Sequence, residues 1–221
     1  MADERAGQRP AVEEVRGRGQ SLDETDEEVV PRQAATVVLL RGGAETLEVL
    51  LVRRTHAARF MAGVWVFPGG AVDAHEGEGD AAHRRAAVRE LKEEAAVGGI
   101  APAELVKFSR WITPREVSER FDTHFYLASA PDGVEPAVDG DECIDLGWFA
   151  PAEALAAHAR GELPLVFPTI KHLEQVGAFA SADALLGHAR GRAVLPVLPR
   201  VVVEGEVARI LLPGEPGYEE E

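Results

Sequence analysis

The chain has 221 residues, a formal net charge of −15 and one cysteine. This length suits one domain with appendages, because domains commonly hold roughly 100–200 residues. The single cysteine, Cys143, excludes an internal disulfide bond and is expected to be a small buried side chain in a reducing compartment.

The sequence carries no apolar run long enough to span a membrane. Its first residues lack the basic-then-apolar pattern of a secretory signal. We therefore predict a protein of the cytoplasm with no membrane partner.

The acidic charge is concentrated at the two ends. Residues 1–30 hold nine acids and four arginines, and residues 201–221 hold six acids and one arginine. An acidic chain without a basic stripe argues against binding to long nucleic acid, although a small phosphorylated ligand remains compatible with it. We expect residues 1–32 to be a disordered acidic segment, 33–214 to be the folded domain and 215–221 to be an acidic tail.

The first elements predicted along the chain form a β-hairpin. Apolar runs at 34–40 and 47–52 are separated by turn residues. A short strand at 65–67 then leads into Pro68-Gly69-Gly70, a turn that permits close backbone approach. The alanine-rich stretch 80–96 predicts a helix with Asp80 as its N-cap.

The second half of the chain alternates predicted strands and helices. The predicted strands cover 105–111, 123–128 and 146–149, and the predicted helices open at Pro151 and cover 168–179 and 182–190. An extended tail with apolar runs at 201–203 and 210–212 follows. This order predicts an α/β/α sandwich around a mixed β-sheet, with a C-terminal helical extension.

Three carboxylates lie close together on the helix predicted at 80–96. Glu90, Glu93 and Glu94 are expected to point the same way, because residues three and four apart share a helix face. The apolar positions that can be buried are Ala87, Val88, Leu91 and Ala95. A solvated helix flank is the alternative. The glycine turn upstream favours a site for a hard cation such as Mg²⁺ or Mn²⁺.

The turn and the acidic helix together resemble the Nudix signature, G-x5-E-x7-R-E-U-x-E-E-x-G-U, in which U is apolar. The matching positions are Gly70, Glu76, Arg89, Glu90, Leu91, Glu93, Glu94 and Val97. Twelve residues rather than seven separate Glu76 from Arg89, so either Glu76 or Glu78 can serve as the first glutamate. Ala96 replaces the late glycine, so we expect the helix to end there without a left-handed residue. The resemblance implies a hydrolase with the Nudix-type α/β/α sandwich.

Residues 50–70 look like the coenzyme A diphosphatase motif, L-L-T-x-T-(S/A)-x3-R-x3-G-x3-F-P-G-G. The matching positions are Leu50, Leu51, Arg59, Gly63 and Phe67 to Gly70, and the departures are Val52, Arg54 and Thr55. Residues 111–114 and 120–123 also resemble the acyl-coenzyme A diphosphatase branch, which has a long loop in its Nudix box.

The resemblance to this branch implies hydrolysis of coenzyme A or acyl-CoA to 3′,5′-ADP and (acyl-)4′-phosphopantetheine. An NADH or ADP-ribose pyrophosphatase is the alternative enzyme. A Nudix fold that binds a nucleotide as a sensor or scaffold, without turnover, is the alternative of another class.

The resemblance also implies roles for the acidic residues. Glu90 and Glu94 would bind the metal with the Gly70 carbonyl, and Glu142 resembles a distal glutamate that completes some Nudix sites. An acidic turn is the alternative for Glu142. Glu93 is the candidate for taking a proton from water, or else a third metal ligand.

Arg89 stands four residues before Glu93 and is predicted to orient it. A surface ion pair is the alternative.

The predicted substrate contacts lie mainly before the acidic helix. Arg59 is expected to face the phosphates, because arginine offers a planar fork to phosphoryl oxygens. Arg54 and Arg120 are weaker candidates, since arginine is more often a surface charge. Gly69 and Phe67 complete the set, with Phe67 as core or pocket wall.

The seven histidines show no paired zinc-ligand spacing, and His83 is expected on the exposed side of the helix. The oligomeric state is left open, with a homodimer among the alternatives.

Overall fold

The structure is a computed structural model, and it describes residues 29–43, 46–58, 61–204 and 207–219. The disordered segment expected at 1–32 therefore lies outside the described residues up to position 28.

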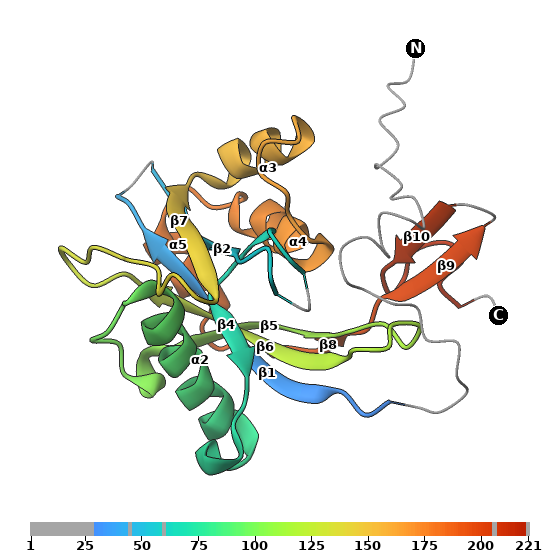
Figure 1. Ribbon diagram of the computed structural model, residues 1–221, viewed down its shortest axis with the longest axis horizontal. Helices are drawn as coiled ribbons and strands as arrows, with labels where there is room; N and C mark the ends of the chain where they lie inside the picture. The colour runs from blue at the N-terminus through green and yellow to red at the C-terminus, as the bar shows by residue number, and fades with distance from the viewer. Residues whose placement is uncertain (1–28, 44–45, 59–60, 205–206, 220–221) are drawn as a thin grey trace.

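A mixed β-sheet forms the centre of the molecule (Figure 1), and within the described residues it has eight strands. The strand order is β3-β2-β1-β6-β5-β8, with β4 paired to β1 and β7 paired to β2. The bounds are β1 (Arg32–Arg41), β2 (Glu48–Arg54), β3 (Trp65–Val66), β4 (Gly69–Ala71), β5 (Val106–Ile112), β6 (Phe121–Ser129), β7 (Cys143–Phe149) and β8 (Pro196–Val197).

Strand β1 lies in the middle because its run is apolar on both faces. Val37, Val38, Leu39 and Leu40 are all fully buried. The predicted hairpin is confirmed, since β1 and β2 pair antiparallel with Leu40 opposite Val49. Strand β6 pairs parallel to β1 over nine residues.

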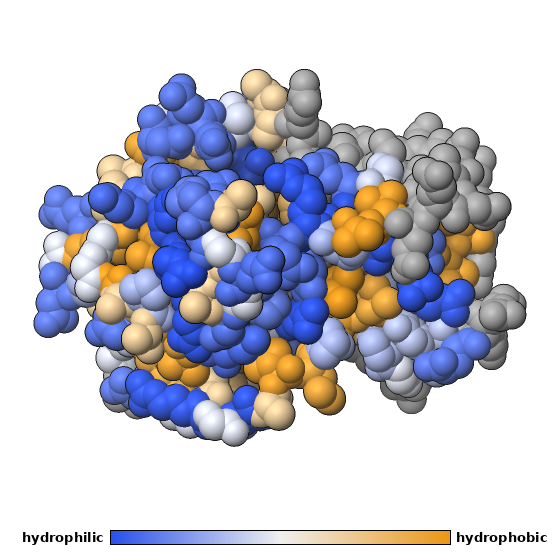
Figure 2. Space-filling view, turned by 90° about the horizontal axis from the view of Figure 1, so that it is seen from below, coloured by the Kyte–Doolittle hydropathy of each residue, from blue (hydrophilic) through white to orange (hydrophobic). Residues whose placement is uncertain are grey.

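One long helix, α2 (Gly79–Ala95), covers one face of the sheet (Figure 1). Ala86, Ala87 and Leu91 are fully buried and belong to one apolar cluster with alternate residues of β1. Figure 2 looks from this side and shows hydrophilic residues over most of the middle of the face, with hydrophobic ones in separate patches.

The prediction that Asp80 is the N-cap of α2 is wrong. The N-cap is Glu78, and Asp80 lies inside the first turn, where its carboxylate accepts from Arg84, Tyr126 and Lys107. Burial would raise the pKa of Asp80, but these donors hold it below its ordinary value.

The prediction that His83 is exposed is also wrong. It is buried and stacks on His124, with the ring centroids 3.8 Å apart. Its ring nitrogens lie 2.8 Å from the Gly79 carbonyl and 2.9 Å from the Gln33 side chain. Most of the residues between Glu76 and Arg89 therefore belong to α2, and through His83 the start of this helix contacts β6.

The end of α2 also differs from expectation. Ala96 adopts the left-handed conformation, with φ 54°. Its amide bonds to the Lys92 carbonyl and the Val97 amide bonds to the Leu91 carbonyl, as in helix ends that normally carry glycine. The backbone geometry of the motif is kept although the glycine is not.

Three helices cover the other face of the sheet (Figure 1), α3 (Pro151–Ala159), α4 (Phe167–Val176) and α5 (Ala182–Ala189). Pro151 opens α3 as predicted, and Ser181 caps α5 by accepting from the Ala184 amide. The α/β/α sandwich with a C-terminal helical extension is confirmed. The short 3₁₀ helices are η1 (Ala74–Glu76) and η2 (Pro102–Glu104).

The tail is extended as expected, and its two apolar runs lie largely in the strands of a hairpin. Strands β9 (Arg200–Glu204) and β10 (Val207–Leu211) pair antiparallel and pack on Val117. Within the predicted acidic tail, the Tyr218 hydroxyl donates to the Leu198 carbonyl.

Among the described residues, none of the helices combines the length and apolar composition that a membrane crossing requires.

The core beneath α4 contains a fully buried histidine. His172 Nδ1 donates to the Pro168 carbonyl at 2.7 Å, and Nε2 accepts from Ser109 Oγ. Its ring also packs against Phe125, with centroids 4.1 Å apart. Burial lowers the pKa of His172 to about 4.

This buried imidazole predicts acid sensitivity. The unfolded chain binds a proton near pH 6.5, whereas folded His172 does so only near pH 4, so its stabilisation is complete above pH 6.5 and is lost as the pH falls towards 4. The expected loss is about 3 kcal/mol in the free energy of unfolding. Urea denaturation at pH 7, 6, 5 and 4 should show a shallower pH dependence for His172→Gln. Equal slopes in the two proteins would contradict the assignment.

Candidate active site

The glycine turn lies directly against the carboxylates of α2. The Gly69 amide donates to Glu94 Oε2 at 2.9 Å. A side chain at Gly70 would meet the Glu90 carboxylate, and one at Gly69 would meet the Ala35 carbonyl and Thr36 Oγ1, both at 2.5 Å. Gly69 therefore leaves no room for a side chain against β1, and a side chain at Gly70 would displace the Glu90 carboxylate.

The carboxylates that approach this turn are buried. Glu94 is 2% exposed and Glu90 is 9% exposed, whereas the Glu93 side chain is 58% exposed. The expectation that the three carboxylates point the same way is therefore only partly met. Glu90 and Glu94 face the turn, and Glu93 reaches solvent.

Burial raises the pKa of both facing carboxyls. The pKa of Glu94 rises to about 7, because the charges of Glu90 and Glu142 add to burial and outweigh the hydrogen bond from Gly69. The pKa of Glu90 also rises with burial, while Arg89 opposes the shift. Ionising both carboxyls in the folded chain therefore costs free energy unless a nearby cation compensates their negative charges.

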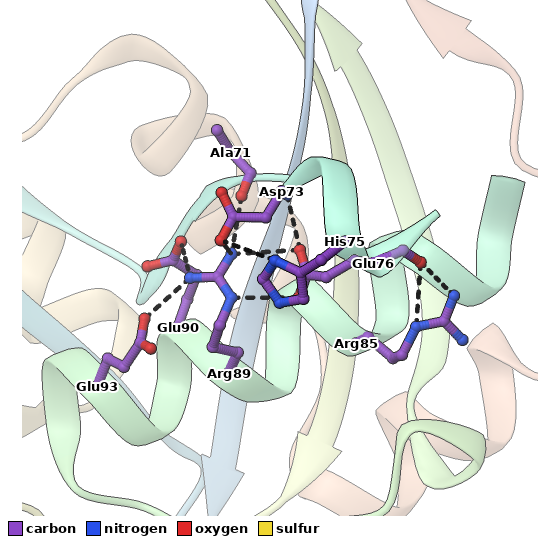
Figure 3. Close-up of polar contacts among 8 residues, drawn as sticks. All are labelled: Ala71, Asp73, His75, Glu76, Arg85, Arg89, Glu90 and Glu93. Atoms are coloured by element: carbon purple, nitrogen blue, oxygen red, sulfur yellow. Dashed lines mark hydrogen bonds and ion pairs between the residues drawn. The ribbon is translucent and has the colours of Figure 1, made fainter. Parts of the chain in front are cut away.

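Arg89 joins the remaining acids (Figure 3). Its Nη1 donates to Glu90 Oε1 at 2.8 Å and to Glu93 Oε2 at 2.9 Å, and its Nη2 donates to the Ala71 carbonyl at 2.9 Å. Burial would lower the pKa of Arg89, but the hydrogen bonds from it to Glu76 and Glu90 raise it above its ordinary value. The predicted contact between Arg89 and Glu93 is present.

The geometry favours Glu76 over Glu78 as the first glutamate of the motif. Glu76 is buried and lies 3.1 Å from Arg89 Nε, and its Oε2 accepts from the Asp73 amide at 2.8 Å. Burial would raise the pKa of Glu76, but the bonds from Arg89 and Asp73 bring it below its ordinary value. Glu78 is exposed and precedes α2.

The sequence did not predict some of the groups that hold Arg89. The Ala71 carbonyl is one of them, and a main-chain acceptor cannot be recognised from the identity of its residue. The spacing of Asp73 and Glu76 is that of a capping box, and the structure contains one there. Arg85 also donates to the Glu76 carbonyl. The spacing between Asp73 and Glu76 could therefore have predicted that Glu76, rather than Glu78, is held in place.

The far end of the site is formed where β2 meets β7. Arg54 opposes Cys143, after a register shift between Arg53 and Arg54. The positive charge of Arg54 and the negative charge of Glu142 both act on Glu94. Within the described residues, Arg54 Nε is buried without a hydrogen-bond partner. Arg54 and Glu142 therefore lie close enough to Glu94 for their charges to act on its pKa.

The other predicted substrate contacts lie elsewhere or outside the described residues. Arg59 is outside them. Arg120 is buried, and its guanidinium donates to the carbonyls of Thr113 and Val29 rather than lying in the acidic cluster. Phe67 is buried in the core, with its ring 6.3 Å from that of His172. These contacts with substrate stay predictions.

The donors present suit a hard divalent cation. They are carboxylate and carbonyl oxygens, and two of the carboxyls have a pKa raised by burial. Within the described ranges, no three His, Cys, Asp or Glu side chains already surround a common point as metal ligands do. Glu90 is bonded to Arg89 and Glu94 to the Gly69 amide.

The two glycines predict a matched pair of variants. Gly69→Ala should lower the free energy of unfolding by about 1–3 kcal/mol, because the added methyl group meets main-chain atoms that are held in the sheet. Gly70→Ala should cost less, because only the end of the Glu90 side chain must move. Guanidinium denaturation of both variants measures the difference. A larger cost for Gly70→Ala would contradict the packing described.

Comparison with known proteins agrees with this geometry. The family model described as the NUDIX domain matches residues 30–168. A curated relative, putative nudix hydrolase 7 of Caenorhabditis elegans, is 29% identical over an alignment of 181 residues, and the match covers 66% of this chain and 60% of that protein.

Two solved structures are also similar. A NUDIX hydrolase from Alicyclobacillus acidocaldarius is 28% identical with a TM-score of 0.65, over 73% of this chain and 97% of that one. A MutT NUDIX hydrolase from Burkholderia pseudomallei is 30% identical with a TM-score of 0.50, over 67% of this chain and 99% of that one. The glycine turn, the acidic helix and the matched family model together show that this chain belongs to the Nudix family.

Proposed function

We propose that the protein is a metal-dependent Nudix hydrolase that cleaves a phosphoric anhydride in a nucleoside diphosphate linked to another group. The observation that carries the proposal is the pair of buried carboxylates, Glu90 and Glu94, set against the Gly69–Gly70 turn. A buried pair of like charges is costly for folding and is relieved by a bound cation.

The chemistry follows from the charge of the substrate. An anhydride between phosphates resists hydrolysis chiefly because its negative charge repels a nucleophile. A divalent cation, Mg²⁺ or Mn²⁺, would be held by Glu90, Glu94, Glu142 and the Gly70 carbonyl, and it would neutralise phosphate charge and lower the pKa of bound water. Proton transfer and orientation are then left to the protein's own side chains.

Glu93 is proposed to take the proton from the attacking water. Its side chain reaches solvent while Arg89 holds one of its oxygens, so it combines access to water with a defined orientation. Arg89 in turn is held by Glu76 and by the Ala71 carbonyl. Arg54 is proposed to contact a phosphate, because its charge acts on Glu94 and its Nε has no hydrogen-bond partner in the described part of the chain.

The preferred substrate is coenzyme A or an acyl-CoA. The support is the partial motif at 50–70 and the spacing of twelve residues rather than seven between Glu76 and Arg89. Of the departures from the motif, Val52 is fully buried in the core, so it alters packing rather than a surface that substrate touches. Arg54 lies at the site, and this departure bears on the substrate directly.

Two alternatives are kept. An NADH or ADP-ribose pyrophosphatase would use the same catalytic groups with a different substrate pocket. A nucleotide sensor without turnover is less well supported, because binding alone does not require Glu90, Glu93 and Glu94 together. The cytoplasmic location and a homodimer stay predictions.

Product analysis tests the function. Purified protein is incubated with coenzyme A, an acyl-CoA, NADH and ADP-ribose, each with Mg²⁺ or Mn²⁺, and the products are identified by mass spectrometry. Wild type should release 3′,5′-ADP and (acyl-)phosphopantetheine, Glu94→Gln should release none, and Glu93→Gln should lower kcat by about 10²–10⁴-fold.

The control is Glu78→Gln, which makes the same chemical change at an exposed position outside the cluster and should keep the wild-type rate. Cleavage confined to NADH or ADP-ribose would contradict the proposed substrate but remain consistent with the proposed mechanism. An unchanged rate in folded Glu94→Gln would overturn the site.

A further inference from the structure

The proposed distal ligand, Glu142, is held only through its main chain. Its carbonyl accepts from the Thr55 amide at 2.9 Å, and the next residue, Cys143, begins β7 opposite Arg54. The Glu142 side chain is exposed, and no hydrogen bond to its carboxylate occurs among the described contacts. The place from which this carboxylate can reach the Glu90–Glu94 pair is therefore set by the backbone of the turn.

Asp139 closes that turn. Its Oδ2 accepts from the Glu142 amide at 3.0 Å, and its Oδ1 accepts from the Cys143 amide at 2.9 Å. The Gly140 amide bonds back to the Cys143 carbonyl at 3.0 Å, and Gly140 has φ 84°. One carboxylate therefore fixes both Glu142 and the first residue of β7.

The Asp139 carboxylate accepts its hydrogen bonds from main-chain amides of the turn. Burial would raise its pKa, but the main-chain amides, led by those of Glu142 and Cys143, hold it below the ordinary value. The neighbouring Asp141 is exposed, and its side chain makes no hydrogen bond among the described contacts. The two aspartates thus carry the same charge in the same turn with different contacts.

We propose that Asp139 is a positioning residue, which places the Glu142 carboxylate over the Glu90–Glu94 pair by accepting hydrogen bonds from the amides of Glu142 and Cys143. This inference rests on the proposed function, because it gives Glu142 a part in binding the cation. Removing the Asp139 carboxylate frees both amides and lets the Glu142 backbone move away from α2. Asp139 itself contacts neither cation nor substrate.

A double-mutant cycle tests the proposal. The variants are Asp139→Ala, Glu142→Gln and the double variant, with Asp139→Asn as the conservative change and Asp141→Ala as the matched control. The affinity for Mn²⁺ alone is measured by calorimetry on the free protein, and kcat and KM are measured on the substrate found by product analysis. Urea denaturation checks that each variant is folded.

Asp139→Ala and Glu142→Gln should each weaken Mn²⁺ binding by about 10–100-fold, the usual cost of losing a residue that supports a metal site. The double variant should be no weaker than Glu142→Gln, because Asp139 acts through Glu142. Asp139→Asn keeps an acceptor oxygen and should recover part of the affinity, and Asp141→Ala should match wild type. If Asp139→Ala does not fold, the same comparison is made with Asp139→Asn.

Additive losses in the double variant would overturn the proposal, as would an equal loss in Asp141→Ala or wild-type affinity in folded Asp139→Ala. Failure of the proposed function is distinguishable, because folded Glu94→Gln would then also keep wild-type Mn²⁺ affinity and rate. If Glu94→Gln loses Mn²⁺ affinity and activity as expected while the Asp139 variants behave as wild type, only the proposed role of Asp139 is contradicted.

Discussion

The close approach of a glycine turn to two buried carboxylates is the constraint on which the rest of the structure depends. Gly70 leaves space for the Glu90 carboxylate, Gly69 leaves space for Ala35 and Thr36 of β1, and the Gly69 amide donates a hydrogen bond to Glu94. Burial raises the pKa of both carboxyls, so their charged forms are disfavoured in the folded chain. The cation proposed above would relieve that cost, because carboxylate oxygens are the ligands that hard divalent cations prefer.

The position of α2 explains why these groups meet so closely. At its C-terminal half the helix faces β4 across the glycines, and at its N-terminal half Asp80 and His83 attach it to strands β5 and β6 through Lys107, Tyr126 and His124. A helix held at both ends over the sheet can keep buried carboxylates in place where packing alone would let it shift. Contacts far from the acidic cluster therefore contribute to its geometry.

The sequence was sufficient to predict the elements that have a periodic apolar pattern and the contacts between closely spaced residues of the motif. The hairpin at 34–52 follows from apolar runs, and the contact between Arg89 and Glu93 follows from their helical spacing. The position of Asp80 and the burial of His83 could not be predicted, because they depend on strands more than 40 residues away that the helix reaches. The left-handed Ala96 could not be predicted either, since tertiary packing overrides a local preference of about 1–2 kcal/mol.

The central claim is that the charge between the turn and α2 is the place of a cation, and diffraction from crystals soaked in Mn²⁺ tests it most directly. An anomalous peak bounded by the carboxylates of Glu90 and Glu94 and the Gly70 carbonyl is the predicted result. The peak should be absent from crystals of Glu94→Gln. Mn²⁺ bound elsewhere on the protein, with no density at these oxygens under conditions that support turnover, would contradict the account.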